Sequence, residues 1–384
     1  MYCLGYVSVY IVRAYPTWVR TVMMVCLLAS VASLFASSFA TKIWHLILLQ
    51  GVVNGTACGI LYPAVLFWVP EWFDKRRNFA SSTMQSGSGV GGIVWPLVID
   101  ALLKRVGYAW TMRTFSIALL IFTIPVVLSV KPRLPLRKME SSESLDRGHI
   151  DSKPVVDEKA EVSPISEMSA PVIESDWKYL KSPLFLSVNA AVFIQGLGHF
   201  CVSFYVSTYT VSMGYSRSQG TIILSIFNAA FVIASVGTGY WCDRNPYPIV
   251  MIVTNTLACA VVFSLWGFAT TLSRILAFYI IFGALSGSFL AIWTPSVTDV
   301  AGSNGSPIMI IMISKGLAVV IGPLIAAAMH PRPHGQDTVC SSVPSSAWGV
   351  CGFRTMVIFV GATMAVATCI SCVALWLRQN RRKF

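Results

Sequence analysis

The sequence is poor in charged residues. Of 384 residues only 11% are Asp, Glu, Lys or Arg, whereas 55% are hydrophobic. Ordinary soluble domains carry roughly 25% charged residues, so this chain has too few polar side chains to cover a surface that faces water. The low charge excludes an ordinary soluble domain and predicts a protein that lies largely in lipid.

The chain also lacks the motifs of ATP-driven pumps and common metalloenzymes. No glycine-rich loop ends in Lys-Ser or Lys-Thr, which argues against a nucleotide-driven pump. No His-Glu-x-x-His element is present, and the chain has only five His. We therefore expect no enzyme activity, no metal and no cofactor, so that any active transport uses an ion or solute gradient.

Apolar segments of about 20 residues, the length that a helix needs to cross a hydrocarbon core, recur along almost the whole chain. They are continuously apolar and lack the alternation of a transmembrane barrel, so helices remain as the spanning structure. Eleven spans are predicted, near residues 1–14, 19–40, 46–70, 79–103, 113–130, 184–209, 219–241, 248–269, 274–297, 307–330 and 354–377.

Residues 131–182 differ from the rest of the chain. They hold ten of its 16 acidic residues and nine Lys or Arg, with Ser and Pro between them. Such a segment cannot bury a core, and we expect a disordered cytosolic linker. The sequence thus predicts an all-α integral membrane protein. Its N-terminal helical half covers residues 1–130, its C-terminal half residues 183–378, and a basic tail residues 379–384.

Basic residues indicate the orientation, because loops rich in Lys and Arg stay on the cytosolic side. With the linker inside, 19 basic residues lie inside and eight outside, and Lys315 falls within a span. We expect a multi-pass protein of the plasma membrane, or else the vacuolar membrane, with a cytosolic C-terminus. The net charge of +12 then reflects topology and contact with lipid headgroups, not nucleic-acid binding. A monomer is the default.

Two of the ten cysteines lie apart from the spans. Cys340 and Cys351 fall in or beside the one long external loop, where oxidising conditions permit a disulfide. We expect either a bridge or two free thiols there.

Residues 71–80 and 86–92 carry the most specific motif. They read Glu-Trp-Phe-Asp-Lys-Arg-Arg-Asn-Phe-Ala and Ser-Gly-Ser-Gly-Val-Gly-Gly. This pattern resembles the fourth-to-fifth-helix signature of the monocarboxylate transporter family of major facilitators, and the fungal branch is the most similar. Further matching pieces are Gln50-Gly51, Gly239 with Asp243-Arg244, Lys315-Gly316 and Gly322-Pro323.

The resemblance implies a major facilitator fold of two matched six-helix halves. The chain offers five spans before the linker and six after it. Met1 already stands inside an apolar segment, so we expect the first family helix to be missing and the sequence to start within the second helix.

The resemblance also implies a cytosolic gate. In major facilitators a Gly-x-x-x-Asp-Arg turn forms charge pairs that hold the inner side closed, and only the second half of this chain has one. A basic triplet beside an Asp lies near it, although such a triplet also fits an ordinary positive-inside anchor. The expected gate residues are Asp74, Lys75, Arg76, Arg77, Gly239, Asp243 and Arg244.

Glycines follow the basic triplet at close spacing. Small residues let helix backbones approach, so the run Gly87, Gly89, Gly91 and Gly92 predicts a close helix contact. That contact is either a moving interface between the two halves or static packing.

Polar groups at the membrane midplane are costly and are therefore functional candidates. The facilitator plan places binding between the halves, on helices one, four, seven and ten. The candidate cavity residues are Asn54, Tyr62, Gln195, His199, Asn228, Trp293 and Lys315.

Each candidate has an alternative role. The two Asn can form interhelical hydrogen bonds, and Trp293 can pack at the kink of Pro295. His199, which shares a helix face with Gln195, is either a proton site or a neutral imidazole bonded to a carbonyl. Lys315 binds an organic anion, pairs with a carboxylate such as Asp299, or snorkels to the cytosolic face.

Proton-coupled lactate carriers are known for an Asp and an Arg four residues apart in helix eight, where this chain has Phe231 and Ser235. The departure favours a larger, more apolar organic anion or metabolite. We expect a secondary transporter that works by alternating access and is coupled to protons. The alternatives are an exporter of a secondary metabolite or drug-like compound, and a truncated, non-transporting relic or sensor.

Overall fold

The computed structural model describes residues 18–73, 76–129, 180–301, 305–329 and 352–381. Within these ranges every regular element is helical, and nine helices are long and apolar enough to cross a membrane. One of them, α5, turns back on itself and crosses twice, so the described residues cross ten times. They include ten of the eleven predicted spans, while the first, near residues 1–14, lies outside them.

Four of these crossings precede the linker. The helices of this N-terminal half are α2 (Val19–Ser37), α3 (Ile43–Leu46), η2 (Ile47–Val53), α4 (Asn54–Glu71) and α5 (Arg77–Ser129). The three elements α3, η2 and α4 form one continuous helical span.

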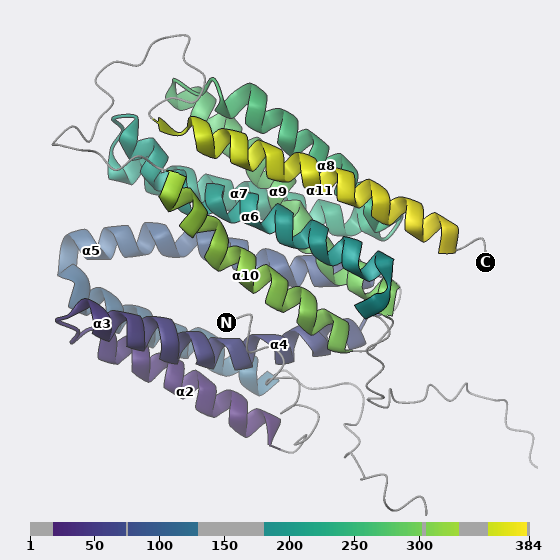
Figure 1. Cartoon of the computed structure of the whole chain (residues 1–384). Coiled ribbons are helices and arrows are strands. Elements are labelled where there is room, and N and C mark those ends of the chain that lie inside the picture. Colours follow the sequence, from purple (N-terminus) through teal and green to yellow (C-terminus); the bar gives the residue numbers. More distant parts are fainter. Residues whose placement is uncertain (1–17, 74–75, 130–179, 302–304, 330–351, 382–384) are drawn as a thin grey trace, which may run out of the picture.

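The α5 helix differs from its prediction. We expected a loop between residues 103 and 113, but the only non-helical residue in α5 is Gly107, with φ 76° and ψ 178°. Glycine adopts this conformation without steric cost because it has no Cβ. A straight helix of 53 residues would be about 80 Å long, so the reversal at Gly107, visible in Figure 1, is what fits α5 to a bilayer.

The η2 segment is a π-helical stretch in the middle of its span. The wider turn changes the regular hydrogen-bonding ladder of an α-helix. One of its carbonyl groups, that of Leu49, accepts a hydrogen bond of 3.0 Å from Ser33 Oγ of α2. The irregular stretch is thus stabilised by a neighbouring helix, and it lies directly before the cavity candidate Asn54.

Six crossings follow the linker, as predicted. The elements of this C-terminal half are α6 (Pro183–Ser212), α7 (Arg217–Cys242), α8 (Tyr247–Val261), η5 (Val262–Trp266), α9 (Leu272–Ala301), α10 (Gly305–Met329) and α11 (Arg354–Arg381). The last helix continues to Arg381, so the first three residues of the predicted basic tail are helical, and the other three lie outside the described residues.

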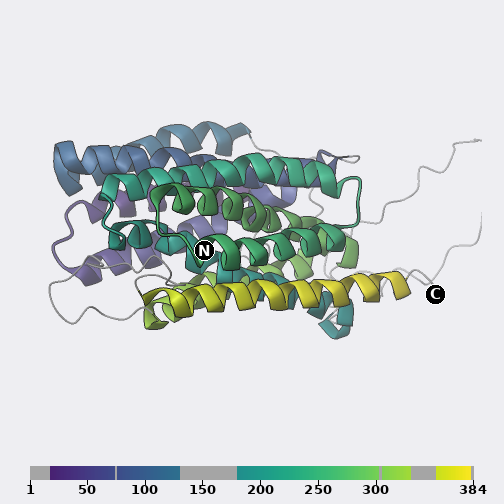
Figure 2. The ribbon, with the colours of Figure 1, turned by 90° about the horizontal axis from the view of Figure 1, so that it is seen from above.

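The helices form two groups that lie against each other (Figure 1), and Figure 2 shows the same bundle from above. The N-terminal group has a small core around Val19, Met23 and Leu27. The C-terminal group has two larger apolar clusters, one of which also contacts Tyr62 and Met84 of the N-terminal group. The closest link between the groups runs along α5 and α7.

Large apolar side chains cover the outside of the bundle. Ile233 is 76% exposed and Phe122 68% exposed, and both lie within spans. An apolar exterior of this extent is unfavourable in water. It therefore supports a bundle surrounded by lipid.

Candidate functional site

A group of buried polar side chains lies inside the C-terminal half, where α6 meets α9. Gln195 of α6 donates from Nε2 to the backbone oxygen and to Oγ of Ser286, at 3.0 Å each. His199, one turn further along α6, has its Nδ1 2.9 Å from the same Oγ. The two α6 residues therefore lie on one face, against a residue of α9.

Lys315 of α10 adds a positive charge to this group. Its side chain is only 4% exposed, and it lies one turn before Ala318 in the same helix. The two helices approach closely at this level, since a Cβ on Gly196 would lie 3.0 Å from the Cβ of Ala318. We call Gln195, His199, Ser286 and Lys315 the C-half polar cluster.

The burial of Lys315 corrects one of its expected roles. A snorkelling lysine would extend its ammonium group to the membrane surface, but this side chain is enclosed by the bundle, so that alternative is wrong. Pairing with Asp299 stays a prediction, because that side chain lies outside the described ones.

Tyr62 of α4 extends from the N-terminal half toward the other half. Its hydroxyl donates to Oε1 of Gln85 in α5 at 2.8 Å, and its ring packs against the apolar cluster that contains Val192 and Phe289. Gln85 is buried, and its Nε2 has no hydrogen-bond partner in the part of the chain that the structure describes. Tyr62 thus contacts an apolar cluster of the C-terminal half.

Asn54 has a different position. Its Oδ1 accepts a hydrogen bond of 2.5 Å from Ser30 Oγ of α2 and lies 3.6 Å from Cys58 Sγ. These contacts hold α2 and α4 together within one half, which supports the interhelical alternative for Asn54.

Asn228 lies on the interface between α5 and α7. Its Nδ2 donates to the carbonyl of Leu224 in its own helix at 2.8 Å. A Cβ on Gly92 of α5 would lie 2.6 Å from Cγ of Asn228. Asn228 therefore belongs to the contact between the halves and not to the C-half polar cluster.

Two of the four predicted packing glycines make this contact close. A Cβ on Gly89 would lie 2.6 Å from Cδ1 of Phe231, and Gly92 is equally near Asn228. Gly87 has nothing within 4 Å, and Gly91 faces only Trp95 of its own helix at 3.6 Å. The prediction of a close helix contact therefore applies to Gly89 and Gly92 alone.

At one end of this interface, Asp243 lies beside the start of α5. Its carboxylate oxygens accept hydrogen bonds from the backbone N–H groups of Asn78 at 3.2 Å and Phe79 at 3.3 Å. These donors belong to the first turn of α5, where N–H groups lack partners within the helix and the helix dipole attracts negative charge. Gly239 fits the same contact, since a Cβ there would lie 2.6 Å from Cβ of Ser82.

Arg244 does not pair with a carboxylate in the described residues. Its guanidinium lies 4.1 Å from the ring centroid of Tyr240, one turn earlier. Asp243 therefore caps a helix of the opposite half, and the expected charge pairs of the gate stay a prediction because Asp74, Lys75 and the side chain of Arg77 lie outside the described residues.

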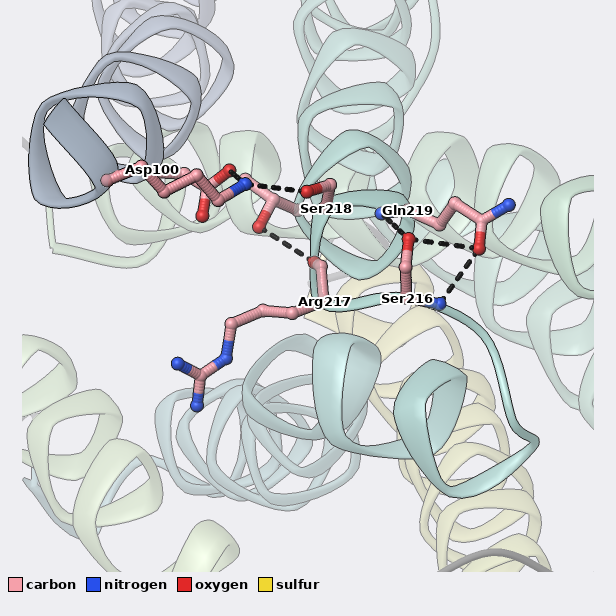
Figure 3. Close-up of polar contacts among 7 residues, drawn as sticks. Asp100, Ser216, Arg217, Ser218 and Gln219 are labelled. Atoms are coloured by element: carbon pink, nitrogen blue, oxygen red, sulfur yellow. Dashed lines mark hydrogen bonds and ion pairs between the residues drawn. The ribbon is translucent and has the colours of Figure 1, made fainter.

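The opposite end of the same interface carries a second polar contact. Lys104 of α5 lies 2.6 Å from Asp100 Oδ2 and donates to Oγ of Ser218 in the first turn of α7 at 2.7 Å. Figure 3 shows Asp100 and Ser218 joined in this way, beside the capping box that Ser216 and Gln219 form at the start of α7. The α5–α7 interface therefore has a polar contact that involves a charged side chain at each end and close glycine contacts between them.

Several predicted site residues fall where the structure makes no statement. Asp74, Lys75, Cys340 and Cys351 lie outside the described residues, and so do the side chains of Arg77 and Trp293. Arg76 is described and is exposed. Their expected roles stay predictions.

Sequence reasoning missed Ser286, Gln85 and Lys104. A long amide inside an apolar span is unusual, so the rule that selected Gln195 could also have found Gln85. Serine is common in membrane helices, and nothing in the sequence distinguishes Ser286 from its neighbours. Lys104 was expected in a loop between two spans, whereas it lies in the helix that precedes the single-residue turn at Gly107.

The fold and these contacts define a class of protein: a multi-pass α-helical membrane protein of two helical halves that meet along α5 and α7. The sequence model of the Major Facilitator Superfamily matches residues 9–323. The chain belongs to this superfamily, as predicted. Its members are transporters and not enzymes, which agrees with the expected lack of enzyme activity. The monocarboxylate-like subtype stays a prediction.

Curated fungal relatives are similar over much of the chain. The MFS-type transporter pynF of Aspergillus niger is 26% identical over 321 residues, which are 82% of this chain and 67% of the relative. The Fujikurins efflux protein of Gibberella fujikuroi is 27% identical over 306 residues, 78% of this chain and 57% of the relative. The chain thus spans little more than half to two thirds of the length of these relatives.

A solved structure shares the fold. The human organic anion transporter MFSD10 (TETRAN) superposes with a TM-score of 0.61 at 14% identity, over 92% of this chain and 76% of that one.

Proposed function

We propose that this chain is a secondary active transporter that exports an apolar organic anion of metabolite size. The observation that carries the proposal is the buried Lys315 beside Gln195 and His199. An ionisable side chain enclosed by membrane helices is rare, and it commonly marks the pathway of a substrate or an ion. An organic anion is the class of substrate that a lysine attracts.

The direction of transport is proposed from relatives. Proteins named for the efflux of agnestins, fujikurins and aspyridones align with most of this chain. Large apolar clusters adjoin the C-half polar cluster, which suits a substrate with an apolar body better than lactate or pyruvate. Proton coupling, with His199 as the proton carrier, belongs to the same proposal.

The mechanism we propose is alternating access. The two halves would rock against each other along the α5–α7 interface, and the Asp243 end would face the cytosol together with the C-terminus. The plasma membrane is the proposed location, and a monomer is the proposed functional unit.

The experiment is efflux of labelled organic acids from cells that express the chain, or the chain extended by any helix that the upstream DNA encodes, with and without a pH gradient. Lys315→Met should reduce efflux at least tenfold, because Met keeps the apolar stem and removes the charge. Lys42→Gln, which removes a charge from an exposed helix cap, is the matched control and should change efflux less than twofold. If neither form moves any acid tested, the proposal fails and the non-transporting alternative gains support.

A further inference from the structure

The amide of Gln195 has a fixed orientation. Its Nε2 contacts the backbone carbonyl oxygen of Ser286, and a carbonyl oxygen can only accept a hydrogen bond. The NH₂ group must therefore face Ser286, and Oε1 must point away from it. In the described residues Oε1 has no hydrogen-bond partner, although the side chain is fully buried.

An unpartnered acceptor in this position is unfavourable. A buried polar atom without a hydrogen bond has lost its contacts with water and gained none in exchange, which destabilises the folded protein. The cost disappears when a molecule that carries a donor binds beside Oε1. Gln195 shares Ser286 with His199, and Lys315 lies one turn before Ala318, which faces Gly196 beside Gln195. Such a molecule would therefore meet an acceptor and a cation in the same region.

We propose that Oε1 of Gln195 accepts an O–H or N–H group of the transported molecule, so that the substrate is an organic anion with a separate free hydrogen-bond donor. The inference rests on the proposed function and narrows its substrate class. Lys315 attracts the anionic group and Gln195 selects the donor. Two apolar residues of α6, Val192 one turn and Val188 two turns before Gln195, contact the apolar body.

Gln85 gives the other half a similar feature. Its amide is held by Tyr62 and keeps Nε2 without a partner among the described residues. Since Tyr62 packs against the cluster that contains Val192, a further polar group of the substrate can be bound from the N-terminal side when the halves close.

The test is a set of three probes that differ by single groups. 3-Hydroxy-5-pentylbenzoate has the anion, the donor and an apolar chain, its 3-methoxy analogue lacks the donor, and its methyl ester lacks the charge. The hydroxyl is placed meta because an ortho hydroxyl would bond to its own carboxylate. Binding to the purified full chain is measured by titration calorimetry.

In the wild type, methylation of the hydroxyl should weaken binding about five- to tenfold, the usual range for one hydrogen bond to a neutral group. In Gln195→Met the same methylation should weaken binding less than twofold, because the acceptor Oε1 is no longer present. Asn255→Leu is the matched control. It removes another fully buried amide whose two polar atoms have no partner in the described residues, located in α8 outside the cluster, and it should keep the wild-type ratio.

Three results would overturn the inference. The methoxy probe could bind the wild type as tightly as the hydroxy probe, which would mean that water satisfies Oε1. The ratio could stay the same in Gln195→Met, or no probe could bind at all. The first two leave the proposed function intact, since efflux is measured separately. A methyl ester that binds as tightly as the acid would contradict the proposal that the substrate is an anion. Should Gln195→Met fail to fold, the ratio in the wild type still decides.

Discussion

At the scale of single residues, the sequence showed which side chains are unusual in lipid but not which of them meet. Gln195, His199 and Lys315 were selected because polar groups are costly at the midplane, and the structure brings these three together. Asn54 and Asn228 were selected by the same rule and lie elsewhere. The sequence shows that a polar residue in a span is unusual. Its hydrogen-bond partner depends on how helices distant in the sequence pack together.

The glycine run gives a residue-scale prediction. Gly89→Ala should lower the free energy of unfolding by about 1–3 kcal/mol, the usual cost of overpacking, because the new Cβ would meet Phe231 and Val232 at 2.6 Å. Gly87→Ala has nothing within 4 Å and should be neutral or stabilise the helix by up to about 1 kcal/mol. Thermal unfolding of both variants in detergent is the measurement. Equal melting temperatures would contradict the packing described for Gly89.

At the scale of helices, hydrophobicity predicted the spans well and the connection inside α5 poorly. Lys104, Arg105 and Arg113 suggested a loop, because charged residues commonly mark the ends of spans. Side-chain charge does not interrupt backbone hydrogen bonds, and the helix continues except at Gly107. Likewise, Asp243 was expected in charge pairs, while the structure gives it backbone N–H partners that no sequence pattern reveals.

The two ends of the α5–α7 interface should differ in strength. Asp243→Asn removes a charge from the first turn of α5, where a helix dipole interaction contributes about 0.3–2 kcal/mol. Lys104→Met breaks an ion pair whose side chains are 55% and 22% exposed, and exposed pairs contribute about 0–1 kcal/mol. With native cysteines replaced, maleimide labelling of the buried site Ser82→Cys should accelerate about threefold or more in Asp243→Asn. It should change little in Lys104→Met. The reverse order would contradict the capping role of Asp243.

At the scale of the whole molecule, the two halves should stay together without a covalent link. α5 packs along α7 with close glycine contacts, and Tyr62 and Met84 pack into the C-terminal apolar cluster. A protease site inserted between residues 130 and 179 should therefore yield two fragments that elute together in size-exclusion chromatography. As a control, the double variant Gly89→Leu/Gly92→Leu should weaken their association. Separation of the unmodified halves would show that the linker holds them.

The turn at Gly107 joins the two crossings of α5 through a single residue. If the segment before it tilts against α7, we expect the segment after it to move as well. Arg113, six residues beyond the turn, would transmit this movement to the end of α2. Its guanidinium lies 4.7 Å from the ring centroid of Phe39, and its Nε donates a hydrogen bond of 3.2 Å to Ser38 Oγ. The turn would thus couple the movement of the two segments of α5. Extending it with flexible residues should uncouple the segment before Gly107 from the segment after it and from α2.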